Sequence, residues 1–409
     1  MFEAILSFIF TYKYIILFYL VVILFIVLHR SKIDVQGKII FLYRTKWGIA
    51  WMDKYSAKYR EWVILLGYIG TGVGFIGMIL ISYTIVLNVY NLIFVPKATS
   101  GVSLVLPGMN IPGIGVLPFW YWLITIFIVA VVHEFSHGVV ARAHNIKVKN
   151  TGVVFFGPIL GAFVEPDEKK MEKEKDIVQY SVLAAGAFSN IILGLVALFL
   201  LVNVFVPVQQ MMIDSNGFTF AENHIATTPF ALAGIEPGTV ILGIDQQQTK
   251  NFEEFKEKLE VYSPGNKVVI VTPTKNYDVV LAKKPEDPTK PFLGIVKISN
   301  EMKIKEKYDS GIGKVAYSSL EWFTGLSNNK LGFLFWLSMI SVGIGLFNLL
   351  PLPIVDGGRM AQVFLHKLYG SEKGEKKYRK VSLFFLFILV VTLIYSVMTM
   401  VTPHISKLL

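Results

Sequence analysis

The chain has 409 residues, of which 54% are hydrophobic and only 17% are charged. This composition, together with several long apolar runs, excludes an ordinary soluble enzyme and is typical of a polytopic membrane protein. There is no cysteine, which excludes disulfides and thiolate metal ligands. The formal net charge is +10, but the basic residues cluster between the apolar runs. We therefore expect them to set membrane topology and expect no nucleic-acid partner.

The first part of the chain contains two apolar runs separated by a basic segment. The first run, about 14–28, lacks a small-residue cleavage pattern after it, so we predict a retained helix and not a signal peptide. Basic residues outnumber acidic ones in 30–61, which predicts a cytoplasmic loop. The uncharged run 62–96 is long enough for a second span. The Gly- and Pro-rich segment 97–118 predicts an extracytoplasmic loop or a short sheet.

The third apolar run carries the most informative residues of the sequence. It starts near Phe119 and contains His133, Glu134 and His137 in its second half. Positions i and i+4 share a helix face, so the two imidazoles can bind one metal ion while Glu134 handles a water proton beside it. An ionisable residue inside a membrane helix costs roughly 2.5 to 3.5 kcal/mol. We therefore favour a metal site over a set of purely structural polar residues.

The next segments leave two alternatives open. Residues 151–165 alternate small and apolar residues as a strand does, and the charged run 167–176 follows as a predicted cytoplasmic loop. The strand-like stretch is either part of that loop region or a membrane-entering hairpin that lines the substrate path. The fourth span, about 177–206, contains Asn190. Because an unsatisfied amide is costly in hydrocarbon, Asn190 either bonds a neighbouring helix or acts near the metal.

A water-soluble composition marks 209–330 as an inserted module. A short helix is predicted to begin at Asn251, and 267–282 reads as a hairpin. This order of elements resembles a PDZ domain over about 225–296. The run 246–248 is Gln-Gln-Gln where such domains usually have a glycine turn, so we expect that hairpin to differ.

The fifth span, about 331–350, ends before the only acidic residue of its region, Asp356. This residue is the natural third metal ligand, because catalytic zinc sites usually take three protein ligands. The preceding Pro-Leu-Pro breaks the helix and the following Gly-Gly lets the backbone turn closely. The alternative is a local ion pair between Asp356 and Arg359. A basic cytoplasmic loop and a last span, about 381–401, complete the expected order.

The pair of motifs resembles the site-2 protease family of intramembrane zinc proteases. His-Glu-x-x-His lies in an early membrane helix, Asn-x-x-Pro-x-Pro-x-x-Asp-Gly lies late in the chain, and a PDZ-like insertion separates them. The resemblance implies that His133, His137 and Asp356 bind one zinc ion and that Glu134 is the catalytic base. Asn190 matches the asparagine of a Gly-Pro-x-x-Asn motif in that family, although alanine replaces the proline here. Asn190 and Asn348 are candidates for holding an extended substrate, which completes the predicted site.

The predicted fold is an α-helical polytopic membrane protein with about six transmembrane helices and an inserted small mixed α/β PDZ-like domain. Helices one and two belong to 1–118, helices three and four with the zinc motif to 119–208, the extracytoplasmic PDZ-like domain with linkers to 209–330, and helices five and six to 331–409. Alternating the sides places both termini outside and the active site towards the cytoplasm of a cell-membrane protein.

The predicted function is an intramembrane zinc endopeptidase that cuts transmembrane helices of substrate membrane proteins. The PDZ-like domain would bind peptide ends by strand addition or exclude bulky substrates. One alternative is a metal-ion transporter that uses the same residues as a transit site. The other is an inactive scaffold that presents the PDZ-like domain.

Overall fold

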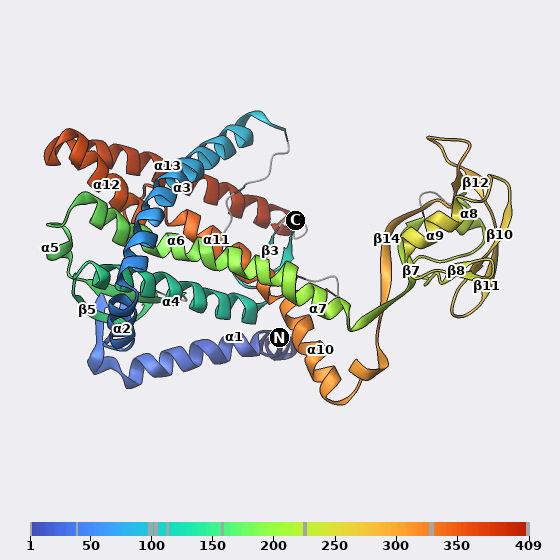
Figure 1. The fold of residues 1–409 in the computed structure, drawn as a ribbon, viewed down its shortest axis with the longest axis horizontal. Helices are drawn as coiled ribbons and strands as arrows, with labels where there is room; N and C mark the ends of the chain where they lie inside the picture. Colours follow the sequence, from blue (N-terminus) through green and yellow to red (C-terminus); the bar gives the residue numbers. More distant parts are fainter. Residues whose placement is uncertain are drawn as a thin grey trace. The chain divides into compact units, whose positions relative to one another are not determined.

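The computed structural model describes residues 2–37, 40–96, 101, 105–111, 114–156, 159–223, 227–326 and 331–405. These form two compact units, which Figure 1 shows as ribbons. The first unit joins Met1–Phe199 to Phe333–Leu409, and the second is Leu200–Gly332.

The first unit is built mainly from long apolar helices. Its helices are α1 (Phe2–Leu28), α2 (Ile49–Lys58), α3 (Arg60–Phe94), α4 (Phe119–Ala143), α5 (Glu168–Met171), α6 (Asp176–Leu200), α11 (Phe333–Phe347), α12 (Asp356–Tyr369) and α13 (Ser371–Ile405), with a 3-10 turn at Arg30–Lys32. Four described helices are long and apolar enough to cross a membrane, and they cover Arg60–Phe94, Phe119–Ala143, Asp176–Gln210 and Ser371–Ser396. The apolar helices Tyr12–Leu28 and Phe333–Phe347 are shorter. The chain is therefore a multi-pass membrane protein, and the expected number of about six spans is supported for four.

Small residues allow these helices to pack closely. Gly194 of α6 lies against α11, where an added Cβ would meet the Ser338 carbonyl oxygen at 2.8 Å. Ser341 of α11 donates a hydrogen bond from Oγ to the Asn190 carbonyl oxygen over 2.8 Å. Small residues and interhelical hydrogen bonds of this kind hold helices together in a bilayer, where apolar surface alone gives no preference for helix over lipid.

An antiparallel sheet of four strands completes the first unit. Its strand order is β1 (Ile33–Gln36), β2 (Ile40–Thr45), β5 (Val148–Phe156), β6 (Ile159–Pro166). Arg44 on β2 donates to Asp34 over 2.7 Å and to Glu165 over 3.0 Å, which ties both edges of the sheet together. The hydrogen bond from Arg44 lowers the pKa of the Asp34 carboxyl group, so this pair stays charged at neutral pH. A separate hairpin joins β3 (Asn110–Ile111) and β4 (Gly115–Val116).

The structure of the first unit confirms one sequence prediction and corrects two. The strand-like segment 151–165 does form the hairpin β5–β6. The segment 30–61, expected as a loop, contains β1, β2 and α2, because β2 pairs with β5 more than 100 residues away. No local pattern marks such a pairing. The segment after Asp356, also expected as a loop, is the helix α12.

The second unit has its own core and its own small sheets. A π-helical turn at Leu201–Phe205 and α7 (Val206–Gln210) lead to β7 (Ile213–Asn223), which pairs with β14 (Ile295–Ile304). A four-stranded sheet has the order β11 (Asn276–Val280), β10 (Lys267–Val271), β8 (Gly243–Ile244), β9 (Gln247–Gln248). The remaining elements are α8 (Pro229–Leu232), α9 (Phe252–Leu259), β12 (Ala282–Lys283), β13 (Pro291–Phe292), a 3-10 turn at Glu306–Tyr308 and α10 (Gly311–Thr324). Phe218, Phe220, Phe230 and Phe255 are fully buried in its core.

The turn between β8 and β9 is formed by Asp245 and Gln246 and contains no glycine, as the sequence analysis expected. Asp245 adopts a left-handed backbone with φ 51° between β8 and β9, which an aspartate tolerates better than most residues. Its carboxylate accepts hydrogen bonds from the Val269 backbone N–H and the Tyr262 hydroxyl. The helix predicted at Asn251 and the hairpin predicted in 267–282 are both present.

The cap of α9 allows a local test of this unit. The Asn251 side chain accepts a hydrogen bond from the Glu254 backbone N–H over 2.8 Å. We expect Asn251→Ala to remove about 1 kcal/mol of helix stability and to speed amide exchange in α9 about fivefold. Hydrogen-exchange mass spectrometry on the full chain measures this, with Asn251→Ser as the matched control that keeps a capping oxygen. Equal exchange in both variants would show that the cap contributes nothing.

Candidate metal centre

Helix α4 presents two imidazoles on one face. His133 and His137 are separated by one helical turn, and their Nε2 atoms lie 3.1 Å apart. Both residues are largely buried, with 8% and 9% of their surface exposed. The sequence builds this helix from a long apolar run, so the two rings are held on a rigid element.

A backbone turn brings the third candidate ligand to the same point. Helix α11 ends at Phe347, and the segment with Pro351 and Pro353 leads to α12, whose first residue is Asp356. The Gly357 backbone N–H donates to the Asn348 carbonyl oxygen over 2.7 Å, which closes this turn. A Cβ on Gly357 would lie 2.2 Å from the Leu349 carbonyl oxygen. Only glycine therefore fits the closure that aims Asp356 at α4.

Asp356 reaches both imidazoles. Its Oδ2 atom lies 3.1 Å from His133 Nε2 and 3.3 Å from His137 Nε2. These three residues form a group whose potential ligand atoms all lie within 4.8 Å of one another. Arg359, the alternative partner of Asp356, instead lies 3.3 Å from Glu168 and forms an ion pair with it.

The hydrogen bonds of the two Nδ1 atoms determine whether each Nε2 atom carries a proton or a lone pair. His137 Nδ1 lies 2.7 Å from the Val182 carbonyl oxygen, which can only accept, so Nδ1 carries the ring proton. The amide Nδ2 of Asn190 lies 3.1 Å from His133 Nδ1. A flip of this amide exchanges its nitrogen and oxygen, so that Oδ1, which has no partner among the described residues, accepts the ring N–H of His133. Both Nε2 atoms then present lone pairs, and the buried Oδ2 of Asp356 accepts no hydrogen bond from the described residues. Three acceptors that face one point require a cation between them.

Zinc fits this donor set. Zinc binds imidazole nitrogen and carboxylate oxygen at about 2.0 to 2.2 Å in a tetrahedral arrangement, which places neighbouring ligand atoms about 3.3 to 3.6 Å apart. The three distances here, 3.1, 3.1 and 3.3 Å, are close to that spacing. Two imidazoles and one carboxylate also leave a fourth position for water, as catalytic zinc sites require.

Helix α6 forms the wall behind the histidines. Val182, Gly186 and Asn190 are spaced four residues apart, so they share one face of α6. A Cβ on Gly186 would lie 2.4 Å from His137 Nε2 and 2.6 Å from His133 Nε2. The sequence interpretation singled out Asn190 but missed the roles of Val182 and Gly186. The fourfold spacing was the signal that could have revealed them.

Glu134 lies on the neighbouring face of α4, next to β6. Its Oε2 accepts a hydrogen bond from the Val164 backbone N–H over 2.9 Å. It also lines a cavity of about 340 Å³ between α4, α2 and the sheet, together with Met52, Phe135 and Phe163. The contact with β6 was not foreseen from the sequence, although the strand-like pattern of 151–165 marked the segment.

The two predicted substrate residues differ in their surroundings. Asn190 is fully buried beside His133. Asn348 is partly buried and supplies the backbone carbonyl that closes the turn before Asp356. The structure therefore brings Asn190 to the metal centre through its side chain and Asn348 through its backbone.

Two histidines, one aspartate and an adjacent glutamate in a membrane protein define the class of site found in zinc peptidases. The comparison with known families agrees, because the family described as Peptidase family M50 matches residues 121–393. The chain belongs to this family, the site-2 protease family, and it is a zinc metalloprotease.

Relatives of the chain include both uncharacterised and protease-named proteins. An uncharacterized protein of Methanocaldococcus jannaschii is 26% identical over 84% of this chain and 83% of its own length. A probable protease of Enterococcus faecalis is 26% identical over 47% of this chain and 51% of its own length. A putative zinc metalloprotease of Rickettsia conorii is 21% identical over 61% of this chain and 88% of its own length.

The close approach of α6 gives a prediction about zinc affinity. We expect Gly186→Ala to lower zinc affinity at least tenfold, because the added methyl group must displace the ligand rings. Gly343→Ala on α11 is the matched control, since no atom lies within 4 Å of an added Cβ there. Competition with a chelator, read as zinc retained per chain, measures the difference. Equal retention by both variants would show that α6 does not support the ligands.

Proposed function

We propose that this protease hydrolyses peptide bonds within or near the transmembrane helices of other membrane proteins. The observation that carries the proposal is the position of the ligand cluster: His133 and His137 lie on α4, a helix that is long and apolar enough to span the bilayer. A peptidase site on such a helix is accessible to segments of membrane proteins and screened from most soluble chains.

We assign the steps of the reaction to the described residues as follows. His133, His137 and Asp356 hold the zinc ion, which when bound acidifies a water molecule and polarises the scissile carbonyl group. Glu134 accepts the proton of the attacking water and later delivers it to the nitrogen of the leaving amine. The hydrogen bond from Val164 N–H keeps the Glu134 carboxylate aimed between α4 and β6. The buried walls of the site exclude bulk water from the scissile bond.

The hairpin β5–β6 is proposed to line the substrate path. A helical peptide bond is shielded by its own hydrogen bonds, so a substrate must be extended locally before it is cut. β6 is an edge strand of its sheet and lies next to Glu134. An extended segment can pair with such an edge through backbone hydrogen bonds. The apolar cavity beside Glu134 then receives substrate side chains.

The sidedness of the protein is part of this proposal. Basic residues lie at the N-terminal end of α3, at the C-terminal end of α4 and in the N-terminal part of α13, with Arg60, Arg142 and Lys380 among them. The positive-inside rule then places the metal centre towards the cytoplasm and the second unit outside. A polar inlet from the cytoplasmic side would supply water. The second unit, proposed to be PDZ-like, would bind peptide ends of substrates.

The decisive experiment separates proteolysis from metal transport. We expect Glu134→Gln to lower the cleavage rate by about 10² to 10⁴ while zinc content stays unchanged, because only proton transfer is lost. Purified chain is incubated with single-span membrane proteins, and mass spectrometry maps the cuts. Glu168→Gln, which removes an exposed carboxylate paired with Arg359, is the control. Cuts confined to soluble segments would contradict the proposal, and zinc flux that survives in Glu134→Gln without any proteolysis would favour a transporter.

The two asparagines give a second test, because we infer different roles for them from their surroundings. We expect Asn190→Ala to weaken zinc binding 10- to 100-fold, as loss of a hydrogen-bond partner of a metal ligand commonly does. Asn348→Ala should leave zinc binding unchanged and raise KM if its side chain holds the substrate. Zinc titration and cleavage kinetics on the same preparations distinguish these effects. Unchanged zinc affinity in Asn190→Ala would return Asn190 to a substrate role.

A further inference from the structure

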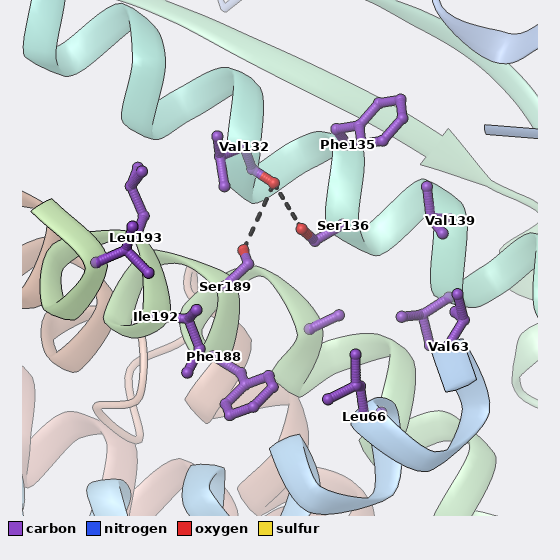
Figure 2. Close-up of a pocket in the computed structure, with 14 residues that line it drawn as sticks. Val63, Leu66, Val132, Phe135, Ser136, Val139, Phe188, Ser189, Ile192 and Leu193 are labelled. Atoms are coloured by element: carbon purple, nitrogen blue, oxygen red, sulfur yellow. Dashed lines mark hydrogen bonds between the residues drawn. The ribbon is translucent and has the colours of Figure 1, made fainter. Parts of the chain in front are cut away.

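A second cavity lies on the other side of α4, away from Glu134. Figure 2 shows it between α3, α4 and α6, and its volume is about 530 Å³. Its lining residues are Val63, Leu66, Gly67, Val132, Phe135, Ser136, Val139, Val140, Ala185, Phe188, Ser189, Ile192, Leu193 and Val196. All three helices are among those able to span a membrane. The hollow is therefore lined by helices that can cross the hydrocarbon region.

The cavity offers no polar group to a ligand. Its only polar side chains are Ser136 and Ser189, and both donate to the Val132 carbonyl oxygen, over 2.7 and 3.5 Å, as the dashed lines in Figure 2 show. Ser189 also lies 2.8 Å from the Gly186 carbonyl oxygen. With both hydroxyl groups satisfied internally, the occupant must be apolar along this stretch.

The dimensions of the cavity suit one hydrocarbon chain. The lining runs from Ala185 to Val196 on α6, which corresponds to about 16 Å of helix. A methylene group is about as large as a water molecule, which takes about 30 Å³ in the liquid. The cavity volume therefore corresponds to a chain of well over ten carbon atoms.

One end of the cavity is marked by cations. Arg60 precedes Val63 by three residues, so both lie on the same face of α3. Its Nε donates to the Ala143 carbonyl oxygen at the end of α4 over 3.0 Å, and about half of its side chain is exposed. The acidic neighbour Glu61 is 86% exposed and lies 3.7 Å from Arg60 NH1. Lys58, at the end of α2, is also exposed.

We propose that this cavity binds an anionic phospholipid, with one hydrocarbon chain between α3, α4 and α6 and the phosphate at Arg60 and Lys58. Charge complementarity selects a phospholipid over a peptide helix, since Arg60 lies one turn from the lining residue Val63 and Lys58 is two residues from Arg60 in the chain. The bound chain packs against Val132, which precedes His133 in the sequence, and against Ser189, whose hydroxyl donates to the Gly186 carbonyl oxygen. The lipid thereby stabilises the spacing of α4 and α6 on which the ligand rings depend.

Lipid retention tests the proposal without reference to proteolysis. The full chain is reconstituted with equal amounts of phosphatidylglycerol and phosphatidylcholine of identical chains, extracted in mild detergent and examined by native mass spectrometry. We expect retained phosphatidylglycerol to exceed phosphatidylcholine. Each of Arg60→Gln and Lys58→Gln should lower the apparent affinity about fivefold, whereas Lys380→Gln, an exposed basic residue on α13, should not. No headgroup preference, or an equal loss in Lys380→Gln, would overturn the proposal.

A second variant tests the cavity itself. Ile192 is partly exposed and lines the hollow, so Ile192→Trp fills it without forcing a buried clash. We expect this variant to lose most of the retained phosphatidylglycerol while zinc content and thermal stability stay near those of the parent. A photo-crosslinker at Val196 identifies the occupant in membranes. Crosslinks to phospholipid support the proposal, whereas crosslinks to a substrate helix or to a second copy of the chain contradict it.

Discussion

The convergence of three buried acceptor atoms on one point is the constraint on which the rest of the first unit depends. Two imidazole nitrogens and one carboxylate oxygen lie within 3.1 to 3.3 Å of one another. With the ring protons on the two Nδ1 atoms, these three atoms have no proton to share. Such an arrangement repels itself unless a cation is present, so the fold must hold the ligands against that repulsion. Metal binding removes this repulsion and thereby stabilises the assembled helices.

Helix α6 provides much of that support, although it contributes no ligand. The Val182 carbonyl fixes the tautomer of His137, the Asn190 amide lies beside Nδ1 of His133, and Gly186 leaves room for both rings. These residues recur every four positions, so one helix face serves both histidines at once. The ring orientation is set by the second nitrogen of each imidazole, as is common for metal-bound histidines.

The sequence was sufficient for the parts of the molecule that local chemistry determines. The apolar runs located the long helices, the i and i+4 histidines located the metal centre, and the Pro-rich turn with its glycines located Asp356. It was not sufficient for β1 and β2, which read locally as a basic loop. β1 pairs with β2, and β2 pairs with β5 across more than 100 residues. Asn190 shows the same division: its burial was predictable from a polar residue in an apolar span, but its partner depended on helix packing.

Helix α4 separates two largely apolar hollows, and among their described lining residues only Glu134, on the side of β6, carries a carboxylate. On one side Glu134 accepts a hydrogen bond from the Val164 backbone N–H of the edge strand β6. On the other side the hydroxyl groups of Ser136 and Ser189 both donate to the Val132 carbonyl oxygen, which leaves an apolar surface. Phe135 lines both hollows and packs edge-on against Tyr55 of α2. This ring is therefore a wall that the two hollows share.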